Sequence, residues 1–403
     1  MRCAESTDGP RRRIGTDALK IPLRYNAGSL WARRTGTAMT VFGIGLTVAI
    51  FITMTALVAG LEATFVETGH DGQLIVIRQG SLNETNSYFG RDLFQIVRFL
   101  PGIVKGTNQE PLAVGEIVVN VNHTRIDGES SNLILRGTSA PSLELRPEAR
   151  FVEGRMFRSG LREIVASRAL SQRFRNLTPG STVHFGRSDW AVVGIFDAGG
   201  SAYDSEVWAD YGAVAQDWDR PIYSSILLRT ENAGAADQIT KRIADDQRIN
   251  LQALSQKKYF ADQASTSMGI KMLGNFIAIV MGIGACFAAM NMMYGSVMSR
   301  SREVATLRAI GFRRRNILAS FLFESTLLGL LGGILGCLLA WPMNGISAAT
   351  ANFETFSEVL FHFRLTPAIL LQGVIFAIVV GILGGYLPAR RAARMKLIEL
   401  LRD

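Results

Sequence analysis

The segment that decides the fold of this chain reads SREVATLRAIGFRRRN over residues 301–316 and continues as ILASFLFESTLLGLLGGILGCLLAW over residues 317–341. Its first part is short, basic and amphipathic, and its second part is apolar over a length that crosses a bilayer. A helix that ends at Gly311, is followed by three arginines and then enters an apolar segment is typical of a cytoplasmic elbow at a membrane surface. Such an elbow is placed to receive a mechanical force from a partner protein.

Three further windows of the sequence have the same length and apolar character. Residues 35–61, 272–299 and 365–389 contain no charged residue, and Glu324 is the single charged residue in 316–353. About 20 apolar residues cross the hydrocarbon core, so each window is long enough for one helix. The sequence therefore predicts a membrane protein with four transmembrane α-helices and a large α+β extracytoplasmic domain between helices 1 and 2.

These windows set the expected boundaries of the segments. The four spans are expected at 37–61, 270–298, 317–341 and 367–388. The cytoplasmic segments are 1–36, a leader with an amphipathic interfacial helix, 299–316, the coupling loop, and 389–403, a tail; the outer segments are 62–268, the outer domain with its stalks, and 342–366, a short loop.

The distribution of charge supports this topology and argues against a nucleic-acid partner. The chain has 43 Lys+Arg and 34 Asp+Glu, a net charge of +9. The segments 1–36, 300–315 and 389–403 hold 8, 6 and 5 basic residues against 3, 1 and 2 acidic ones, whereas 61–268 holds 22 basic and 25 acidic residues. Because the excess lies beside the spans on one side, it follows the positive-inside rule, and both termini are expected in the cytoplasm.

The basic segment before the first span is expected to lie on the inner leaflet. Apolar residues recur at helical spacing over 23–31, with arginines beside them. We expect Trp31, Arg33 and Arg34 to anchor this helix at headgroup depth. The alternative is a straight cytoplasmic extension of the first span.

The outer segment has the texture of a separate folded domain. Strand-like runs occur at 73–79 and 115–121, and a hairpin is expected to pair 182–185 with 190–196. Ser167 is a candidate N-cap for a helix that follows a strand. About 200 residues of this kind are enough to bury a core of their own.

Two parts of the chain resemble a known family. Residues 384–403 look like the closing motif of the FtsX-like permease domain of ABC transporters, and residues 151–229 resemble the periplasmic core of MacB-type permeases. Further residues that stand as in the FtsX-like domain are Glu303, Leu307, Arg308, Ala309, Gly311, Glu324, Gly329, Gly332, Gly333 and Gly336.

The resemblance implies a permease subunit of an ATP-driven MacB-like transporter in a bacterial inner membrane, working in efflux or secretion by mechanotransmission. Its implied partners are a separate ABC ATPase subunit, a second permease copy, membrane lipids and, for an efflux machine, a periplasmic adaptor. It also implies that one lobe of the outer domain, 150–220, is inserted into another made of 73–137 and 224–254. A lipoprotein-releasing permease and an FtsX-like regulator of periplasmic enzymes remain alternatives.

No catalytic motif is present in the sequence, so the chain is not expected to be an enzyme. There is no G-x-x-x-x-G-K-[ST] phosphate loop, no G-x-S-x-G elbow and no H-E-x-x-H helix. Neither cofactor nor metal is expected in this chain, and the resemblance places ATP and Mg on the partner ATPase. The outer segment contains no cysteine, which argues against a zinc or redox site there.

The elbow is the predicted functional site. By resemblance it contacts the ATPase, and physically its arginines are also suited to anionic lipid headgroups. Both roles are compatible. The expected ATPase-coupling residues are Glu303, Val304, Leu307, Arg308, Ile310 and Gly311, and the expected anchors are Arg313, Arg314 and Arg315.

Two features of the spans have structural interpretations. An ionised Glu324 costs about 3 kcal/mol at mid-bilayer, so it should face protein or water, by an interhelical hydrogen bond or by pairing with arginines. A proton relay would need further ionisable groups at that depth. Small-residue faces suited to close helix packing, within or between chains, are formed by Gly329, Gly332, Gly333, Gly336, Gly381, Gly384 and Gly385.

Overall fold

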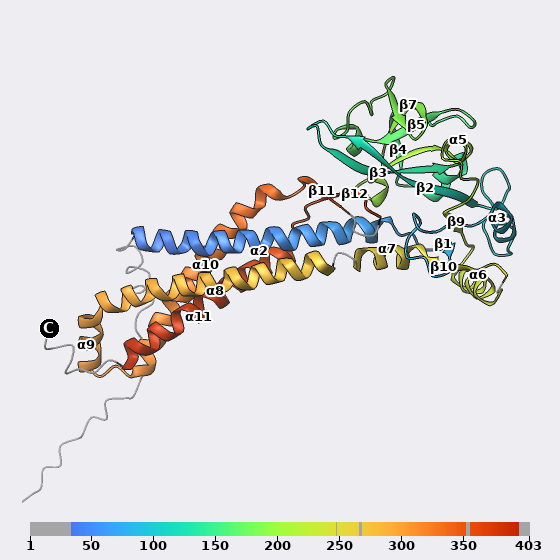
Figure 1. The fold of residues 1–403 in the computed structure, drawn as a ribbon. Coiled ribbons are helices and arrows are strands. Elements are labelled where there is room, and N and C mark those ends of the chain that lie inside the picture. The colour runs from blue at the N-terminus through green and yellow to red at the C-terminus, as the bar shows by residue number, and fades with distance from the viewer. Residues whose placement is uncertain (1–33, 247, 266–267, 352–354, 395–403) are drawn as a thin grey trace, which may run out of the picture. The chain divides into compact units, whose positions relative to one another are not determined.

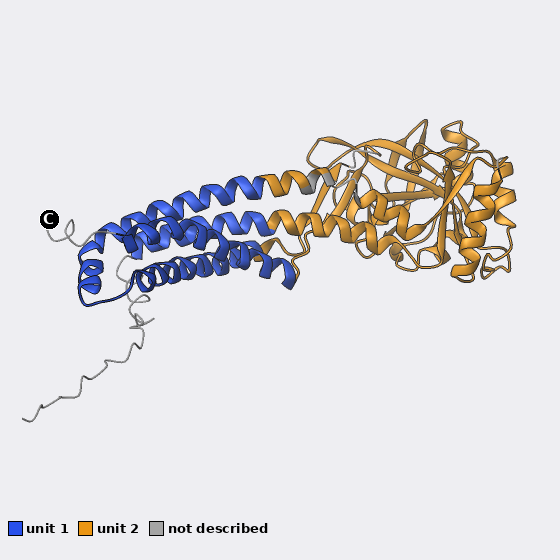
Figure 2. Ribbon diagram, turned by 90° about the horizontal axis from the view of Figure 1, so that it is seen from below, with its two compact units in different colours: residues 1–52, 277–340, 367–403 blue, residues 53–276, 341–366 orange. Residues whose placement is uncertain are grey.

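The computed structural model describes residues 34–246, 248–265, 268–351 and 355–394. It divides into two compact units, residues 1–52, 277–340 and 367–403, and residues 53–276 and 341–366 (Figure 2). We call these the helical unit and the outer unit. The expected amphipathic helix, with Trp31 and Arg33, and the last part of the closing motif lie outside the described residues.

Four of the described helices are long and apolar enough to cross a membrane. The predicted fold class, four such helices with an α+β domain between the first and second, is confirmed (Figure 1). The long helices and the short helix of the elbow are α2 (Arg34–Thr68), α8 (Met268–Ser299), α9 (Ser301–Ala309), α10 (Arg314–Ala340) and α11 (Pro367–Arg394).

The outer unit is built on one sheet in which two groups of strands meet at a long hairpin. The order is β10-β1-β9-β2-β3-β8-β5-β7-β4, and β6 pairs with β7. The strands are β1 (Gln73–Arg78), β2 (Ala113–Thr124), β3 (Ser130–Thr138), β4 (Arg150–Gly154), β5 (Glu163–Ser167), β6 (Thr182–Phe185), β7 (Ser188–Asp197), β8 (Glu206–Asp210), β9 (Ser225–Arg229) and β10 (Leu251–Ser255).

Short helices connect these strands, and polar caps define where three of them begin. Ser167 accepts a hydrogen bond from the amide of Leu170 and caps α4 (Arg168–Ser171), as predicted. Asp210 and Asn232 cap the two helices that follow β8 and β9 in the same way. The remaining elements are α3 (Arg91–Arg98), α5 (Tyr211–Asp217), α6 (Ala233–Asp245), α7 (Gln256–Ser265), η1 (Ala140–Leu145) and η2 (Ala202–Ser205).

The outer unit contains two cores, and strands β2 and β3, both expected in the first lobe, contribute side chains to the second core. Side chains of β1, β9 and β10 pack with α3 and α6 into one core, and β5, β6 and β7 build a second. Strand β3, expected in the first lobe, pairs in parallel with β8 and places Leu133 and Leu135 in the second core. The reason is that β2 and β3 form a continuous hairpin that spans both groups of strands.

The segment expected as a short outer loop has secondary structure of its own. Residues 341–366 contain η3 (Trp341–Met343) and a hairpin of β11 (Ser347–Ala351) and β12 (Glu358–His362). Leu360 joins the core around β5–β7, and Val359 and Phe361 join a third cluster with the outer end of α2. The short apolar run over 359–361 was the available signal for this strand.

Candidate functional site

The elbow begins where α8 ends and a sharp turn leads into α9. After α9, Gly311 has a φ of 106°, a left-handed conformation that glycine adopts without strain. The amides of Gly311 and Phe312 donate to the carbonyls of Arg308 and Leu307, which closes the helix as a C-cap. The chain then enters α10 at Arg314, so only a few residues separate the elbow helix from the next span.

One face of α9 is buried inside the helical unit. Val304 is 3% exposed and packs with residues of α8, α10 and α11, and Ala305 is buried beside it. Val304 therefore packs inside this chain, and its predicted role in coupling stays a prediction. The apolar side chain that the elbow does expose is Ile310, at 66%, with Leu307 and Arg308 half-buried and Glu303 exposed.

An arginine at the end of α8 holds the elbow to α10. Arg300 Nη1 lies 3.1 Å from Glu324 Oε2, and its Nε lies 3.1 Å from Glu303 Oε2. The guanidinium also lies 5.7 Å from the ring centre of Phe321. Glu324 is 4% exposed and thus faces protein, as expected. Sequence reasoning left Arg300 out of the site, although its place as the first basic residue after the second span was a signal.

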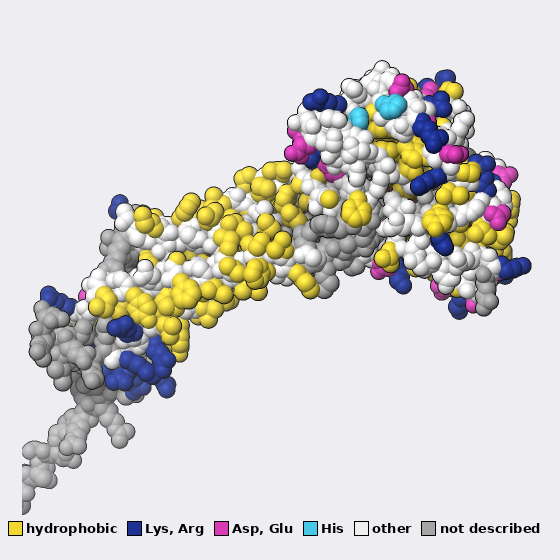
Figure 3. Space-filling view, viewed as in Figure 1, with side chains coloured by type: hydrophobic (Ala, Val, Ile, Leu, Met, Phe, Trp, Pro, Cys, Tyr) yellow, Lys and Arg dark blue, Asp and Glu magenta, His cyan; other side chains and the backbone are white. Residues whose placement is uncertain are grey.

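The predicted anchors that the structure describes are all exposed, namely Arg34, Arg313, Arg314 and Arg315. Lys and Arg side chains gather at one end of the helical unit, while hydrophobic side chains cover the helices (Figure 3). Exposed arginines near the end of α11, which were not predicted as anchors, are Arg390, Arg391 and Arg394. The anchoring role of these residues stays a prediction.

The glycine faces pack helices within this chain. A Cβ on Gly329 or Gly333 would lie 2.6 or 3.0 Å from Ala377 of α11, and one on Gly332 or Gly336 would lie 2.6 Å from Ile44 or Val48 of α2. On α11, a Cβ on Gly381 or Gly385 would meet Ser325 of α10, and one on Gly384 would meet Ala289 of α8 at 2.8 Å. These contacts join α10 to α11, α10 to α2 and α11 to α8. The glycines therefore hold all four long helices of the helical unit together.

The outer unit contains a buried network of charges that sequence reasoning missed. Arg136 of β3 bonds to Glu84, Glu116 and Glu206 at 2.6 to 2.9 Å, and Arg146 makes two bonds to Glu116 at 2.7 and 2.8 Å. All five residues are buried. Burial alone raises the pKa of Glu116, but the two guanidiniums outweigh it and lower that pKa to about 2.

Aromatic residues surround this network and extend it to α7. The guanidinium of Arg146 lies 4.5 Å from the ring centre of Tyr203, and Trp208 donates to Glu206 at 2.8 Å. The hydroxyl of Tyr259 on α7 accepts from the amide of Glu84 at 3.2 Å. The network thereby joins β2, β3 and β8 to a helix that precedes α8 in the sequence. No local motif marks it, because its members lie far apart along the chain.

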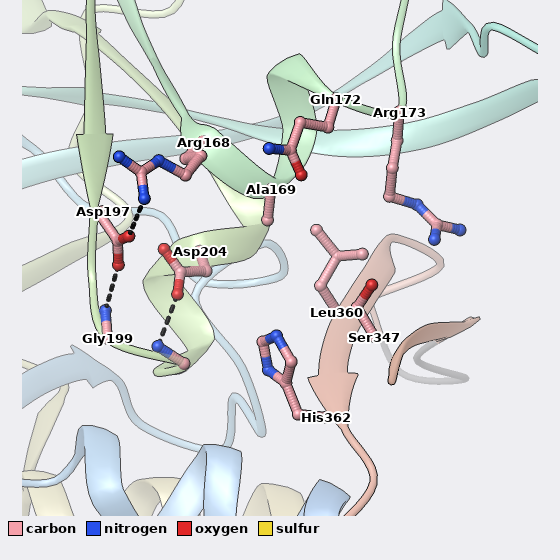
Figure 4. A pocket seen from close by; sticks show the side chains of 11 residues that line it. Arg168, Ala169, Gln172, Arg173, Asp197, Gly199, Asp204, Ser347, Leu360 and His362 are labelled. Atoms are coloured by element: carbon pink, nitrogen blue, oxygen red, sulfur yellow. Dashed lines mark hydrogen bonds and ion pairs between the residues drawn. The ribbon is translucent and has the colours of Figure 1, made fainter. Parts of the chain in front are cut away.

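A polar cavity of about 330 Å³ lies between α4, η2 and the β11–β12 hairpin (Figure 4). Arg168 pairs with Asp197 at 3.3 Å, and Asp204 accepts from the amide of Gly200 at 2.6 Å. Burial raises the pKa of Asp204. His362 lines the opposite wall. Cations and carboxylates are mixed here, so the cavity shows no preference for a ligand of one charge.

The residues that the structure describes offer no group of three or more His, Cys, Asp or Glu side chains suited to a metal ion. Two of the four histidines instead bond to single carboxylates, His70 to Glu148 and His184 to Asp189. The candidate sites are therefore the elbow in the helical unit and, in the outer unit, the buried charge network and the polar cavity.

Comparison with family models covers both units. Residues 37–246 match the MacB-like periplasmic core domain, and residues 275–397 match the FtsX-like permease C-terminal domain. Among curated relatives, the macrolide export ATP-binding/permease protein MacB of Chlorobium luteolum is 26% identical over 410 residues, covering 93% of this chain and 59% of that protein. Its counterpart in Escherichia coli is 24% identical over 402 residues, covering 94% and 60%. The matched part of the chain spans 29% to 60% of the length of such relatives.

Two of the solved structures that match this chain are extracytoplasmic domains. The extracellular domain of the noncanonic ABC-type transporter YknZ from Gram-positive bacteria is 17% identical, with a TM-score of 0.36, and covers 45% of this chain and 99% of that one. The periplasmic region of MacB from Actinobacillus actinomycetemcomitans is 12% identical, with a TM-score of 0.37, and covers 48% and 92%. Because the core-domain model alone matches more than half of the chain, this protein belongs to the family of ABC-transporter permeases with a MacB-like periplasmic core domain and an FtsX-like permease domain.

Proposed function

We propose that this chain is the permease subunit of an ATP-driven MacB-like transporter, acting in efflux or secretion from a bacterial inner membrane. A separate subunit would bind ATP and Mg and hydrolyse the nucleotide. Two permease copies and a periplasmic adaptor would complete the machine. The relatives carry the MacB name, which favours this function over a lipoprotein-releasing permease or a regulator of periplasmic enzymes.

The observation that carries the proposal is the two-sided character of α9. Its inner face is locked to the spans through Val304 and Ala305, and its outer end exposes Ile310. An exposed apolar residue beside charged ones suits the groove of a partner protein. Because the inner face is packed, a partner that displaces α9 would displace the spans with it.

Arg300 supplies the second part of the mechanical connection. It joins the start of α9 to Glu324, which lies about ten residues inside α10. A packed apolar face and a buried ion pair resist sliding of the elbow along the spans. When the partner closes on ATP, the resulting movement of α9 would be transmitted to α8 and α10, and then along the chain to the outer unit.

The second permease copy would bind through surfaces other than the glycine faces, because those faces are used inside one chain. Exposed apolar residues of α8 remain available for a partner helix or for lipid, among them Phe276, Ile283 and Phe287. The proposed orientation places the elbow and the arginine-rich helix ends in the cytoplasm, following the positive-inside rule.

The test replaces the exposed Ile310 and the half-buried Leu307 of the elbow. Leu307→Ser with Ile310→Ser should leave the permease inserted and folded, reduce copurification of the ATPase at least tenfold and abolish ATP-driven export. The matched control is Ala309→Ser, which adds a hydroxyl to the same exposed helix without removing an apolar side chain. Normal ATPase binding and normal export by the double variant would show that force enters elsewhere.

A further inference from the structure

Two cavities of about 380 and 340 Å³ meet on the outer unit beside β2. They share Thr85, Asn86, Val118 and Arg220 in their walls, so they form one groove, which we call the β2 groove. Tyr88 lies in the first cavity, and Trp218 and Phe356 lie in the second. Each cavity has the size of a typical small-molecule site.

Among the described residues that line the β2 groove, the charged side chain is positive. Arg220 is exposed and makes no ion pair with any described residue, and no described Asp or Glu lines either cavity. Glu84, which precedes Thr85, is turned into the interior and bonded to Arg136. The guanidinium of Arg78 lies 4.7 Å from the ring centre of Tyr88 and adds a second positive charge nearby.

The walls of the groove also carry apolar and hydrogen-bonding surface. Tyr88 is 56% exposed, and Phe356 is 70% exposed. Aromatic faces of this kind bury large areas at low conformational cost when a ligand binds. Asn86 also lines both cavities, and a side-chain amide can bond to a polar group of a ligand.

Backbone conformation supports the assignment of a binding site. Phe356 has a φ of 53° and Asp219, next to Arg220, has a φ of 52°. A bulky residue such as Phe rarely adopts this region, Asp adopts it more readily, and strained residues cluster at ligand sites. The carbonyl of Phe356 accepts from the side chain of Asn132 at 3.1 Å, which helps to hold this conformation.

We propose that the β2 groove binds an amphipathic organic anion. Its carboxylate or sulfonate pairs with Arg220, and its apolar or aromatic body lies against Tyr88, Trp218 and Phe356. A cation of the same shape would meet Arg220 without a compensating carboxylate among the described residues, so it is disfavoured. This inference concerns binding only and does not depend on ATP-driven export.

The test uses the full chain in lipid nanodiscs and three probes of similar size, observed by fluorine NMR. The probes are 4-(trifluoromethyl)benzoate, the neutral 4-(trifluoromethyl)benzamide and the cationic 4-(trifluoromethyl)benzylammonium. We expect line broadening in the order benzoate, benzamide, benzylammonium, after subtraction of the signal from empty nanodiscs. Arg220→Gln should weaken benzoate binding about fivefold, as expected for an exposed ion pair, and leave benzamide binding unchanged.

Three further variants separate the contributions of the positive charge and of the aromatic ring to probe binding. Arg220→Lys keeps the charge and should retain the preference for benzoate. Phe356→Gly removes the ring and relieves the backbone, so binding of all three probes should weaken. Arg187→Gln alters an exposed arginine outside the groove and should change nothing. Equal binding of benzoate and benzylammonium, or benzoate binding unaffected by Arg220→Gln in a protein with an unchanged melting temperature, would overturn the proposal.

Discussion

Arg300 at the end of α8 and Glu324 inside α10 form an ion pair of 3.1 Å between residues that are 12% and 5% exposed in their side chains. The pair connects two spans across the elbow, and it places a counter-charge beside an acidic residue in a helix of membrane length. A buried carboxylate at such a position is expected to face protein or water. The ion pair with Arg300 gives this acidic residue a structural partner.

This pair predicts a specific pattern of stability. Arg300→Met removes a cationic partner of a buried carboxylate and should lower the free energy of unfolding by about 3 kcal/mol. Glu324→Met in the same chain removes the buried charge as well and should recover most of the loss. Thermal melts of the purified variants in one detergent measure both. A double variant no more stable than Arg300→Met would mean that the pair does not hold the elbow.

The close packing of glycines predicts which positions reject a side chain. Gly381→Val would place a Cβ 2.6 Å from the backbone oxygen of Ser325, so α10 and α11 would have to separate. Overpacking of this kind costs about 1–3 kcal/mol. The matched control is Gly284→Val on α8, where no atom lies within 4 Å. Size-exclusion chromatography should show aggregated Gly381→Val protein and a normal peak for the control; identical peaks would contradict the packing.

The buried network predicts the response of the outer unit to acid. The pKa of Glu116 is about 2 in the folded chain against an ordinary value of 4.5. A lowered folded pKa gives stability that is complete above about pH 4.5 and is lost as the pH falls toward 2. Burial of Asp204 raises its pKa and acts in the opposite direction. The loss of stability that Glu116 causes below pH 4.5 should therefore be measured as the difference in free energy of unfolding between the parent protein and a variant of Glu116.

The variant for this comparison is Glu116→Gln. It should be about 3 kcal/mol less stable at pH 7, because Arg136 and Arg146 lose a buried partner. Its stability should fall less steeply than that of the parent between pH 4.5 and 3. Fluorescence of the buried Trp190 and Trp208 during urea unfolding of the full chain reports both quantities. Parallel curves for the two proteins would exclude Glu116 as the acid-sensitive group.

The β11–β12 hairpin predicts a charge-reversal rescue. Arg173 Nη2 lies 2.9 Å from Glu358 Oε1, and Glu358 is 5% exposed. Arg173→Glu or Glu358→Arg alone should destabilise the outer unit by about 3 kcal/mol, and the two together should restore most of it. The same reversal at Arg168 and Asp197, a more exposed pair, should change stability by less than about 1 kcal/mol. Proteolysis within residues 341–366 measures release of the hairpin.

The membrane helices could be predicted because their signal is local. Each of the four spans is a continuous apolar window, and the physics of the bilayer requires such a window to be helical. The elbow was also predictable, because Gly311 and the arginines that follow it lie within a few residues of each other. The strands around 73–79 and 182–196 were visible for the same reason, through alternation and turn residues.

The tertiary structure alone decided which distant residues meet. Glycine spacing predicted close packing of helices, but only the fold showed that Gly381 lies against Ser325 in the same chain. The meeting of Arg136 with Glu84 and Glu206 depends on the pairing of β3 with β8, which are about 70 residues apart. Side-chain contacts of this kind arise from strand order and burial, which have no local pattern. For that reason the sequence determined the spans, the elbow and the family, whereas the buried network, the hairpin and the β2 groove were decided by the fold.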